Sequence, residues 1–232
     1  MKTIGLIGGM SWESTQTYYR LLNEQVRERL GGLHSAKVIL NSVDFAEIEP
    51  LQHQGDWAGT AEILTTAAKS LEAAGADFFL IATNTMHKVA PKLQNAVKIP
   101  LLHIVDATAE ALKADGITTV GLLGTKFTME QAFYRERLEA QGLKVLIPNE
   151  VQGNAVHEVI FKELCLGVTK SASKQAYLDI ISDLDQQGAQ AVILGCTEIG
   201  MLIKPTDTPV PLYDTTKLHA NAAVTYALSN DC

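Results

Sequence analysis

The chain has 232 residues, of which 47% are hydrophobic and 19% charged, a composition that supports a large folded core in one or two domains and argues against disorder. Its net charge of −7 argues against a nucleic-acid-binding surface, so any bound anion must be held by local groups. No apolar run approaches the ~18 residues of a membrane span, and no cleavage pattern follows the short apolar run at the start, so we expect neither a membrane partner nor a signal peptide.

Short apolar runs alternate with stretches of helical periodicity along the chain. This strand–helix–strand rhythm predicts parallel sheets with right-handed crossovers. The predicted strands are residues 2–8, 37–43, 77–83 and 100–105, and the predicted helices are residues 14–30 and 57–75, the second ending on Gly75.

The second half of the sequence repeats the first. Four pairs of segments match in the same order and at nearly constant offset: 5–9 with 121–125, 18–24 with 133–139, 75–85 with 188–198 and, more loosely, 100–108 with 209–216. We therefore predict two similar parallel-sheet α/β domains, related by a pseudo-two-fold axis, with the active site in the cleft between them. The first covers residues 1–104 and the second 105–212, and a C-terminal helix at about 213–232 is expected to pack back on the first domain.

Cys196 stands at the exit of the apolar run 191–195, and its counterpart in the repeat is Thr83. The carboxyl ends of strands in open α/β sheets are where ligands bind. Cys196 also precedes an apparent helix start, which should lower the pKa of its thiol and favour the reactive thiolate. Three widely spaced cysteines without C-x-x-C argue against a disulfide framework or a zinc site and predict a reducing, cytoplasmic setting, with Cys165 and Cys232 structural or incidental.

Polar residues around these two strand exits are candidates for substrate binding. Hydroxyls, an amide and free backbone N–H groups at helix starts make a carboxylate cradle, although simple N-capping explains the same residue types. The loops after the first strand of each half should rim the same cleft, and GGMSWEST is not a dinucleotide fingerprint. The substrate-binding candidates are Met10, Gln52, Asn84, Thr85, Thr125, Thr197 and Glu198.

Several basic residues near these motifs are weaker candidates. Lys88, Lys126 and Lys162 could grip a substrate carboxylate, while Arg20 and Arg135 lie in repeat-matched helices and can be structural. His87 follows Thr83 by about one helical turn, either as a neighbour of the site or as a surface histidine. No His, Asp or Glu grouping has metal-ligand spacing, so we expect no metal.

Five motifs carry a resemblance to a known family: GLIGGMSWEST, SVDF, ATNTMHK, LLGTKFTM and LGCTEIG. Through them nearly the whole chain resembles the cofactor-independent aspartate/glutamate racemases. The resemblance implies a two-domain α/β homodimer that needs no pyridoxal phosphate or other cofactor. It also implies two acid/base residues that exchange the α-proton of an amino acid from opposite faces.

The sequence departs from the usual pair of cysteines, because Thr83 stands where the first one is expected. A threonine hydroxyl does not ionise near neutral pH and is not a comparable base. By analogy with the family, Cys196 faces the α-hydrogen of the L-enantiomer. We therefore predict that Cys196 deprotonates L-aspartate or L-glutamate and that Thr83 or a water protonates the opposite face, so that the L-enantiomer is favoured.

Two other hypotheses are consistent with the same residues. Single-cysteine relatives of these racemases include arylmalonate decarboxylases, in which one thiol protonates an enolate after loss of carbon dioxide. A protein that kept the cleft and lost catalysis with residue 83 would instead be a non-catalytic acidic-amino-acid-binding protein.

Overall fold

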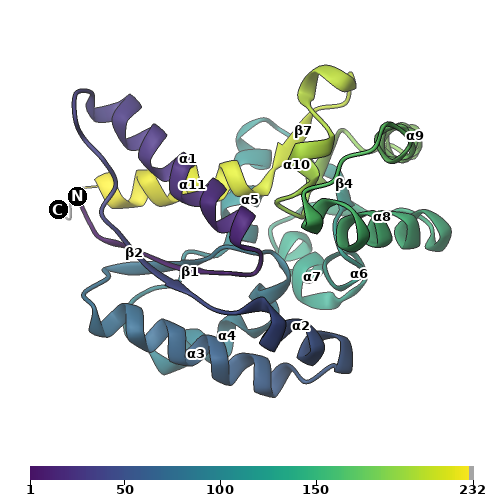
Figure 1. Cartoon of the computed structure of the whole chain (residues 1–232). Helices are drawn as coiled ribbons and strands as arrows, with labels where there is room; N and C mark the ends of the chain where they lie inside the picture. The colour runs from purple at the N-terminus through teal and green to yellow at the C-terminus, as the bar shows by residue number, and fades with distance from the viewer. Residues whose placement is uncertain (230–232) are drawn as a thin grey trace. The chain divides into compact units, whose positions relative to one another are not determined.

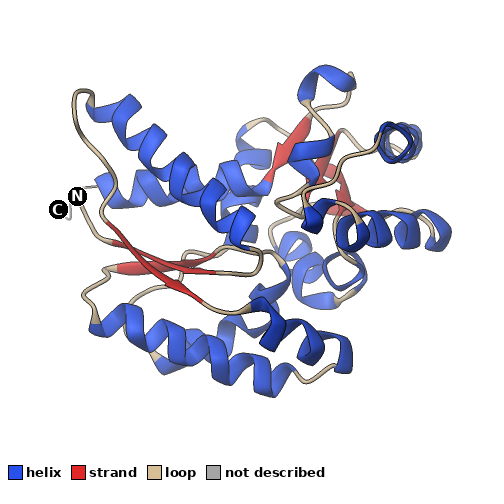
Figure 2. Ribbon diagram, viewed as in Figure 1, coloured by secondary structure: helices blue, strands red, loops and turns tan. Residues whose placement is uncertain are grey.

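The computed structural model describes residues 1–229, so the prediction for Cys232 lies outside the described residues. The chain divides into two units, each with its own parallel sheet (Figures 1 and 2). The first unit is Met1–Ile104 together with the C-terminal helix from His219 on, and the second is Val105–Leu218. Within the described residues, every helix is too short or too polar to cross a membrane.

The first unit has three parallel strands in the order β2-β1-β3. They are β1 (Ile4–Gly8), β2 (Val38–Ser42) and β3 (Phe78–Ile81). Its helices are α1 (Trp12–Leu30), α2 (Phe45–Gln54), α3 (Trp57–Ala73), the 3-10 helix η1 (Thr85–Val89), α4 (Ala90–Ala96) and the greater part of α11 (Thr215–Leu228).

The second unit has four parallel strands in the order β5-β4-β6-β7. They are β4 (Thr119–Leu123), β5 (Lys144–Leu146), β6 (Ala191–Leu194) and β7 (Leu212–Asp214). Its helices are α5 (Ile104–Ala114), α6 (Lys126–Glu130), α7 (Ala132–Ala140), α8 (Glu150–Lys162), η2 (Leu164–Leu166), α9 (Ser171–Gln186), α10 (Ile199–Leu202) and η3 (Pro205–Asp207). Both units place their first strand between their second and third, so the predicted repeat is confirmed at the level of topology.

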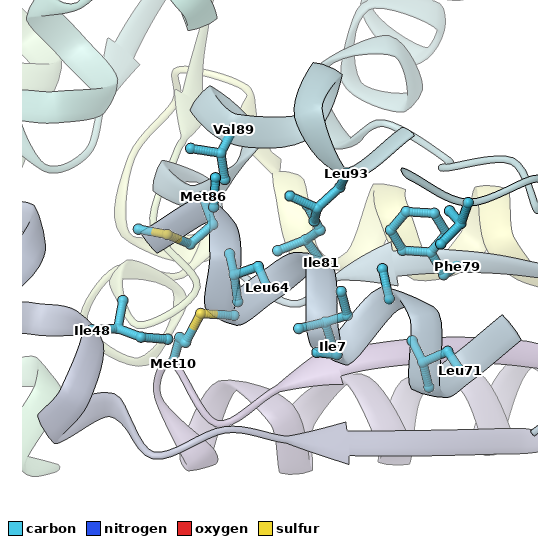
Figure 3. Close-up of a cluster of buried hydrophobic side chains, with 14 of the residues drawn as sticks. Ile7, Met10, Ile48, Leu64, Leu71, Phe79, Ile81, Met86, Val89 and Leu93 are labelled. Carbon is cyan, nitrogen blue, oxygen red and sulfur yellow. The ribbon is translucent and has the colours of Figure 1, made fainter. Parts of the chain in front are cut away.

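The sheet of the first unit is covered on both faces, which explains why β1 and β3 are apolar throughout. One face packs against α1 and α11, whose small side chains Ala220, Ala223 and Ala227 allow close approach. The other face packs against α2, α3 and α4, and Figure 3 shows Ile7 and Ile81 of the sheet beside Leu64 of α3.

The strand predicted at 100–105 is wrong. Leu101 forms a single parallel bridge with Phe79, and α5 already begins at Ile104. The Leu102 amide still donates to the Phe79 carbonyl at 3.0 Å. Beyond it the backbone is bonded to side chains, because the carbonyl of Leu102 lies 2.8 Å from Nε2 of His219 and the amide of Ile104 lies 3.3 Å from Nε2 of His87. The matching segment of the second unit does form a strand, β7, which agrees with the weakness of the match between the two.

Gly9 shapes the loop that follows β1. Its φ is +95°, and a Cβ atom built on it would lie 2.0 Å from the carbonyl oxygen of Val43, at the exit of the neighbouring strand. The next turn is held by Thr15, whose Oγ1 accepts from the Gly9 amide at 2.8 Å and donates to the Ser11 carbonyl at 2.9 Å. Only glycine permits both this backbone conformation and this close approach.

We predict that Gly9→Ala destabilises the protein far more than Gly55→Ala does. Gly55 also has a positive φ, +74°, but open space around its missing side chain. Replacing it should cost about 1 kcal/mol of unfolding free energy for the left-handed conformation alone. Gly9→Ala adds overlap with backbone, for a total of roughly 2–6 kcal/mol. Urea unfolding of the two variants measures the difference, and equal losses would contradict the close approach.

Candidate active site

The exit of β6 carries the candidate thiol of the second unit. The Gly195 amide lies 2.6 Å from the carbonyl oxygen of Leu123, at the end of β4, and a Cβ on Gly195 would come within 2.8 Å of that oxygen. Gly124, which follows β4, is equally close, since its Cβ would lie 3.1 Å from the Gly195 carbonyl. The loops that lead to Thr125 and to Cys196 therefore leave the sheet side by side.

Cys196 donates a hydrogen bond to a carboxylate two residues further on. Its Sγ lies 2.9 Å from Oε2 of Glu198, and the Thr197 hydroxyl donates to the same oxygen at 2.6 Å. Glu198 is buried, with 6% of its surface exposed, whereas Cys196 and Thr197 are partly exposed. The thiol proton is thus held between the sulfur of a partly exposed residue and a buried carboxylate.

The expectation of a lowered thiol pKa is wrong. Burial, together with the negative charge of Glu198, raises the pKa of Cys196 well above its usual value. A thiolate at Cys165, in η2, would raise the pKa of Cys196 further. Helix α10 has four residues and begins at Ile199, too short a helix to offset these effects by its dipole. The thiol is therefore protonated at neutral pH.

The exit of β3 holds Thr83 in the first unit. Its backbone is fixed on both sides, because Ser14 Oγ donates to the Ala82 carbonyl at 2.9 Å and His87 Nδ1 lies 2.8 Å from the Thr83 carbonyl. The side chain of Thr83 is partly exposed, while Asn84 and Thr85 are 3% and 7% exposed. Asn84 precedes η1 without capping it through its side chain, so simple N-capping does not account for Asn84.

Met10 and Gln52 lie beneath η1 in the same unit. Met10 is 5% exposed and packs in the apolar cluster with Ile48 (Figure 3). Gln52 is 4% exposed and directs its Nε2 to the sulfur of Met86, in η1, at 3.7 Å. Both residues support the segment that follows Thr83.

Thr125 serves as the N-cap of α6. Its Oγ1 accepts from the Thr128 amide at 3.3 Å, and the side chain is 6% exposed. The capping interpretation therefore holds for Thr125.

The weaker candidates differ in their exposure and in their partners. His87 is 2% exposed, so the interpretation as a surface histidine is wrong. Lys88 lies over the Trp57 ring, 3.9 Å from its centroid, and burial lowers the pKa of Lys88. Lys162 forms an exposed ion pair with Glu158.

Two further basic candidates, Arg20 and Lys126, also have partners in the structure. Arg20 forms an exposed ion pair with Glu24, and the Lys126 amide lies 3.2 Å from Nδ1 of His157. No pattern in the sequence indicates the contact of Ser14 with the Ala82 carbonyl, because the two residues are far apart in the chain. Within residues 1–229, no three His, Cys, Asp or Glu side chains gather closely enough to hold a metal ion.

Comparison with known proteins identifies the family. The family model described as Asp/Glu/hydantoin racemase matches residues 7–223. The chain belongs to the Asp/Glu/hydantoin racemase family. As a member of this family it is an isomerase of the amino-acid racemase type.

Three relatives illustrate how far this racemase similarity extends. A crystal structure titled as a putative Asp/Glu racemase from Yersinia pestis has 54% sequence identity and a TM-score of 0.93, covering 99% of this chain and 100% of its own. An aspartate racemase homologue from Pyrococcus horikoshii has 37% identity and a TM-score of 0.87, with the same coverage of both chains. The broad specificity amino-acid racemase RacX of Bacillus subtilis is 24% identical over 97% of this chain and 98% of its own.

We predict that Glu198→Gln makes Cys196 more reactive at neutral pH. Removing the carboxylate charge lowers the pKa of the thiol, so a larger fraction is thiolate at pH 7. The alkylation rate of the Cys196-containing peptide by iodoacetamide, followed by mass spectrometry between pH 6 and 10, measures this. In the wild type the alkylation rate should rise about tenfold per pH unit across neutrality. In Glu198→Gln the same rise should occur at lower pH. Glu158→Gln is the control, and a curve for Glu198→Gln that matches it would contradict the assignment.

Proposed function

We propose that this protein racemises aspartate, glutamate or both without pyridoxal phosphate, by removing the α-proton and returning a proton to the opposite face. One observation carries the proposal: Cys196 donates to the buried Glu198 carboxylate at the exit of β6, 2.9 Å away, while Thr83 occupies the corresponding exit of β3. The internal repeat and the family both support a single substrate site to which these two exits contribute.

The proposed base is the thiolate of Cys196. The α-hydrogen of an amino acid is weakly acidic, so a base of high pKa is better matched to it than one of low pKa. The raised pKa of Cys196 makes its thiolate scarce at neutral pH but strongly basic once formed. Glu198 is the acceptor placed to take the thiol proton, which frees the sulfur to remove the α-proton of the L-enantiomer.

The proposed partner on the opposite face is Thr83 or a water that it holds. A hydroxyl can relay a proton to the carbanion but cannot remove one from the D-enantiomer at a comparable rate. At saturating substrate the enzyme should therefore turn over L-substrates much faster than D-substrates. The equilibrium constant between enantiomers remains one, so kcat/KM for racemisation is the same from both enantiomers, and kcat and KM must differ between them by the same factor.

The proposed substrate class follows the relatives and the polar groups at the two exits. Asn84, Thr85 and Thr125 are uncharged donors suited to a carboxylate on which negative charge develops during the reaction. The hydroxyl proton of Thr197 is already donated to Glu198, so Thr197 would bind a substrate through its backbone amide. Met10 and Gln52 support the segment around Thr83, and the carboxylate of Glu198 suits the positive charge of an α-ammonium group. The similarity to the Yersinia protein, described as an Asp/Glu racemase, and to the Pyrococcus aspartate racemase homologue favours acidic amino acids for this chain. A homodimer in the cytoplasm is part of the proposal.

We predict that Cys196→Ala abolishes α-proton exchange. Proton NMR in heavy water follows the α-proton signals of L-aspartate, L-glutamate and both D-enantiomers. General acid–base catalysis contributes about 10²–10⁴-fold, so the variant should lose at least that factor. Cys165→Ala serves as the matched control and should retain most of the exchange. Exchange that survives Cys196→Ala would remove this residue from the mechanism.

We predict that Thr83→Cys raises the rate from D-enantiomers. The substitution places an ionisable thiol where the hydroxyl cannot act as a base, so both directions become available. Thr83→Ser, which keeps the hydroxyl, should leave the ratio of the L and D rates unchanged. Initial rates of α-proton loss from each enantiomer measure this ratio. Equal initial rates in the wild type would contradict the one-sided assignment.

A second candidate function rests on the same threonine. One cysteine and no matching base is the arrangement that an arylmalonate-type decarboxylase requires, since its thiol only protonates an enolate. Incubation with disubstituted malonates separates the two activities, because only a decarboxylase releases carbon dioxide. Binding without either reaction, seen as a rise in Tm with acidic amino acids, would identify a non-catalytic binding protein.

A further inference from the structure

Three histidines form a buried cluster in the first unit that the proposed chemistry does not use. His87, His103 and His219 are 2%, 7% and 0% exposed. The ring of His87 lies 4.5 Å from that of His103 and 5.8 Å from that of His219, measured between centroids. Tyr18 of α1 completes the cluster through a contact of its hydroxyl with His219.

The partners of His87 determine its protonation state. Its Nδ1 lies 2.8 Å from the Thr83 carbonyl oxygen, which can only accept, so Nδ1 carries the hydrogen. Its Nε2 lies 3.3 Å from the Ile104 amide, which can only donate, so Nε2 carries none. His87 is therefore neutral and held in the Nδ1–H tautomer.

The same reasoning applies to His219. Its Nε2 lies 2.8 Å from the Leu102 carbonyl oxygen and must donate, so its Nδ1 accepts from the Tyr18 hydroxyl at 2.8 Å. His219 is thus neutral in the opposite tautomer. Together the two rings bind the carbonyl of Leu102 and the amide of Ile104, on either side of His103.

The segment bound in this way occupies a special place in the chain. The first unit ends at Ile104, and the chain returns to it at His219. The cluster therefore binds Ile104, the last residue before the chain enters the second unit. It also contains His219, the first residue after the chain returns to the first unit. Through Nδ1 of His87 it also reaches the backbone of Thr83.

We propose that neutral His87 is a positioning residue for Thr83, tying the backbone at the exit of β3 to the crossover segment at Ile104. If both ring nitrogens of His87 carried a proton, Nε2 could no longer accept from the Ile104 amide, because both groups would be donors. The hydrogen bond to Ile104 would then be lost. Burial lowers the pKa of His87, and His103 and His219 lower it further, which keeps this histidine neutral. This inference rests on the proposed function, because Thr83 matters only if it serves the second face of the substrate.

Two substitutions separate the two hydrogen bonds of His87. His87→Asn places an amide nitrogen near the position of Nδ1 and keeps the donor to Thr83. His87→Gln places an amide oxygen near the position of Nε2 and keeps the acceptor for Ile104, but loses the donor to Thr83. Tyr18→Phe is the control, because it removes one hydrogen bond from the same buried cluster without touching Thr83 or Ile104.

The test measures the ratio of two products. Inversion gives the deuterated D-amino acid, and exchange with retention gives the deuterated L-amino acid. With L-substrate in heavy water, deuterated L-product reports the step at Cys196 alone, whereas deuterated D-product also needs proton delivery on the Thr83 side. His87→Gln should lower the ratio of D- to L-product by roughly three- to tenfold, the effect of losing one hydrogen bond. His87→Asn cuts the tie at its Ile104 end and should also lower the ratio, by no more than His87→Gln does, whereas Tyr18→Phe should leave it within about twofold. A purely structural role would reduce both products together in every variant, and that result would overturn the proposal.

A second measurement needs no turnover. Long-range proton–nitrogen NMR spectra at pH 7 distinguish the two neutral tautomers from the imidazolium, and the His87 signals are assigned by their absence in His87→Gln. The Nδ1–H tautomer is expected. An Nε2–H tautomer or an imidazolium would overturn the inference. A wild type that exchanges no α-proton, with the expected tautomer present, would instead count against the proposed function.

Discussion

The close approach of neighbouring strand exits is the constraint on which the candidate site depends. Parallel pairing ends the strands of each sheet at a common edge, and glycine then lets adjacent loops come nearer than any side chain would permit. Gly9 lies against the Val43 carbonyl in the first unit, and Gly195 lies against the Leu123 carbonyl in the second. Cys196 directly follows Gly195, whereas Thr83 follows β3, where the Ser14 hydroxyl binds the Ala82 carbonyl. The position of the candidate thiol is thus a consequence of strand pairing and of a backbone contact that only glycine allows.

Burial governs the charge of the groups at both exits. In the second unit it holds Cys196 as a thiol, and in the first it holds His87 as a neutral imidazole, each by disfavouring the charged form. Each group keeps its proton in a defined hydrogen bond. The Glu198 carboxylate is the accepting partner of the thiol, and the Thr83 carbonyl is that of the imidazole.

The two units share a topology but differ in chemistry. The third strand of each ends on a short polar loop, and these loops carry Cys196 in one unit and Thr83 in the other. A duplicated fold provides two equivalent positions, and the side chains decide what each position can do. The proposed preference for L-enantiomers rests on this difference between an ionisable thiol in one unit and a hydroxyl in the other.

The sequence by itself determined the parallel α/β architecture, the internal repeat and the residues at the strand exits. These follow from local patterns, because apolar runs, helical periodicity and glycines record which faces are buried and where the chain turns. It failed at residues 100–105, at the pKa of Cys196 and at the burial of His87. Those properties depend on partners far away in the chain, such as His219 for the Leu102 carbonyl, or on the desolvation that packing produces. Only the tertiary structure decides them, because hydrogen-bond partners and local dielectric are properties of the folded neighbourhood and not of the segment.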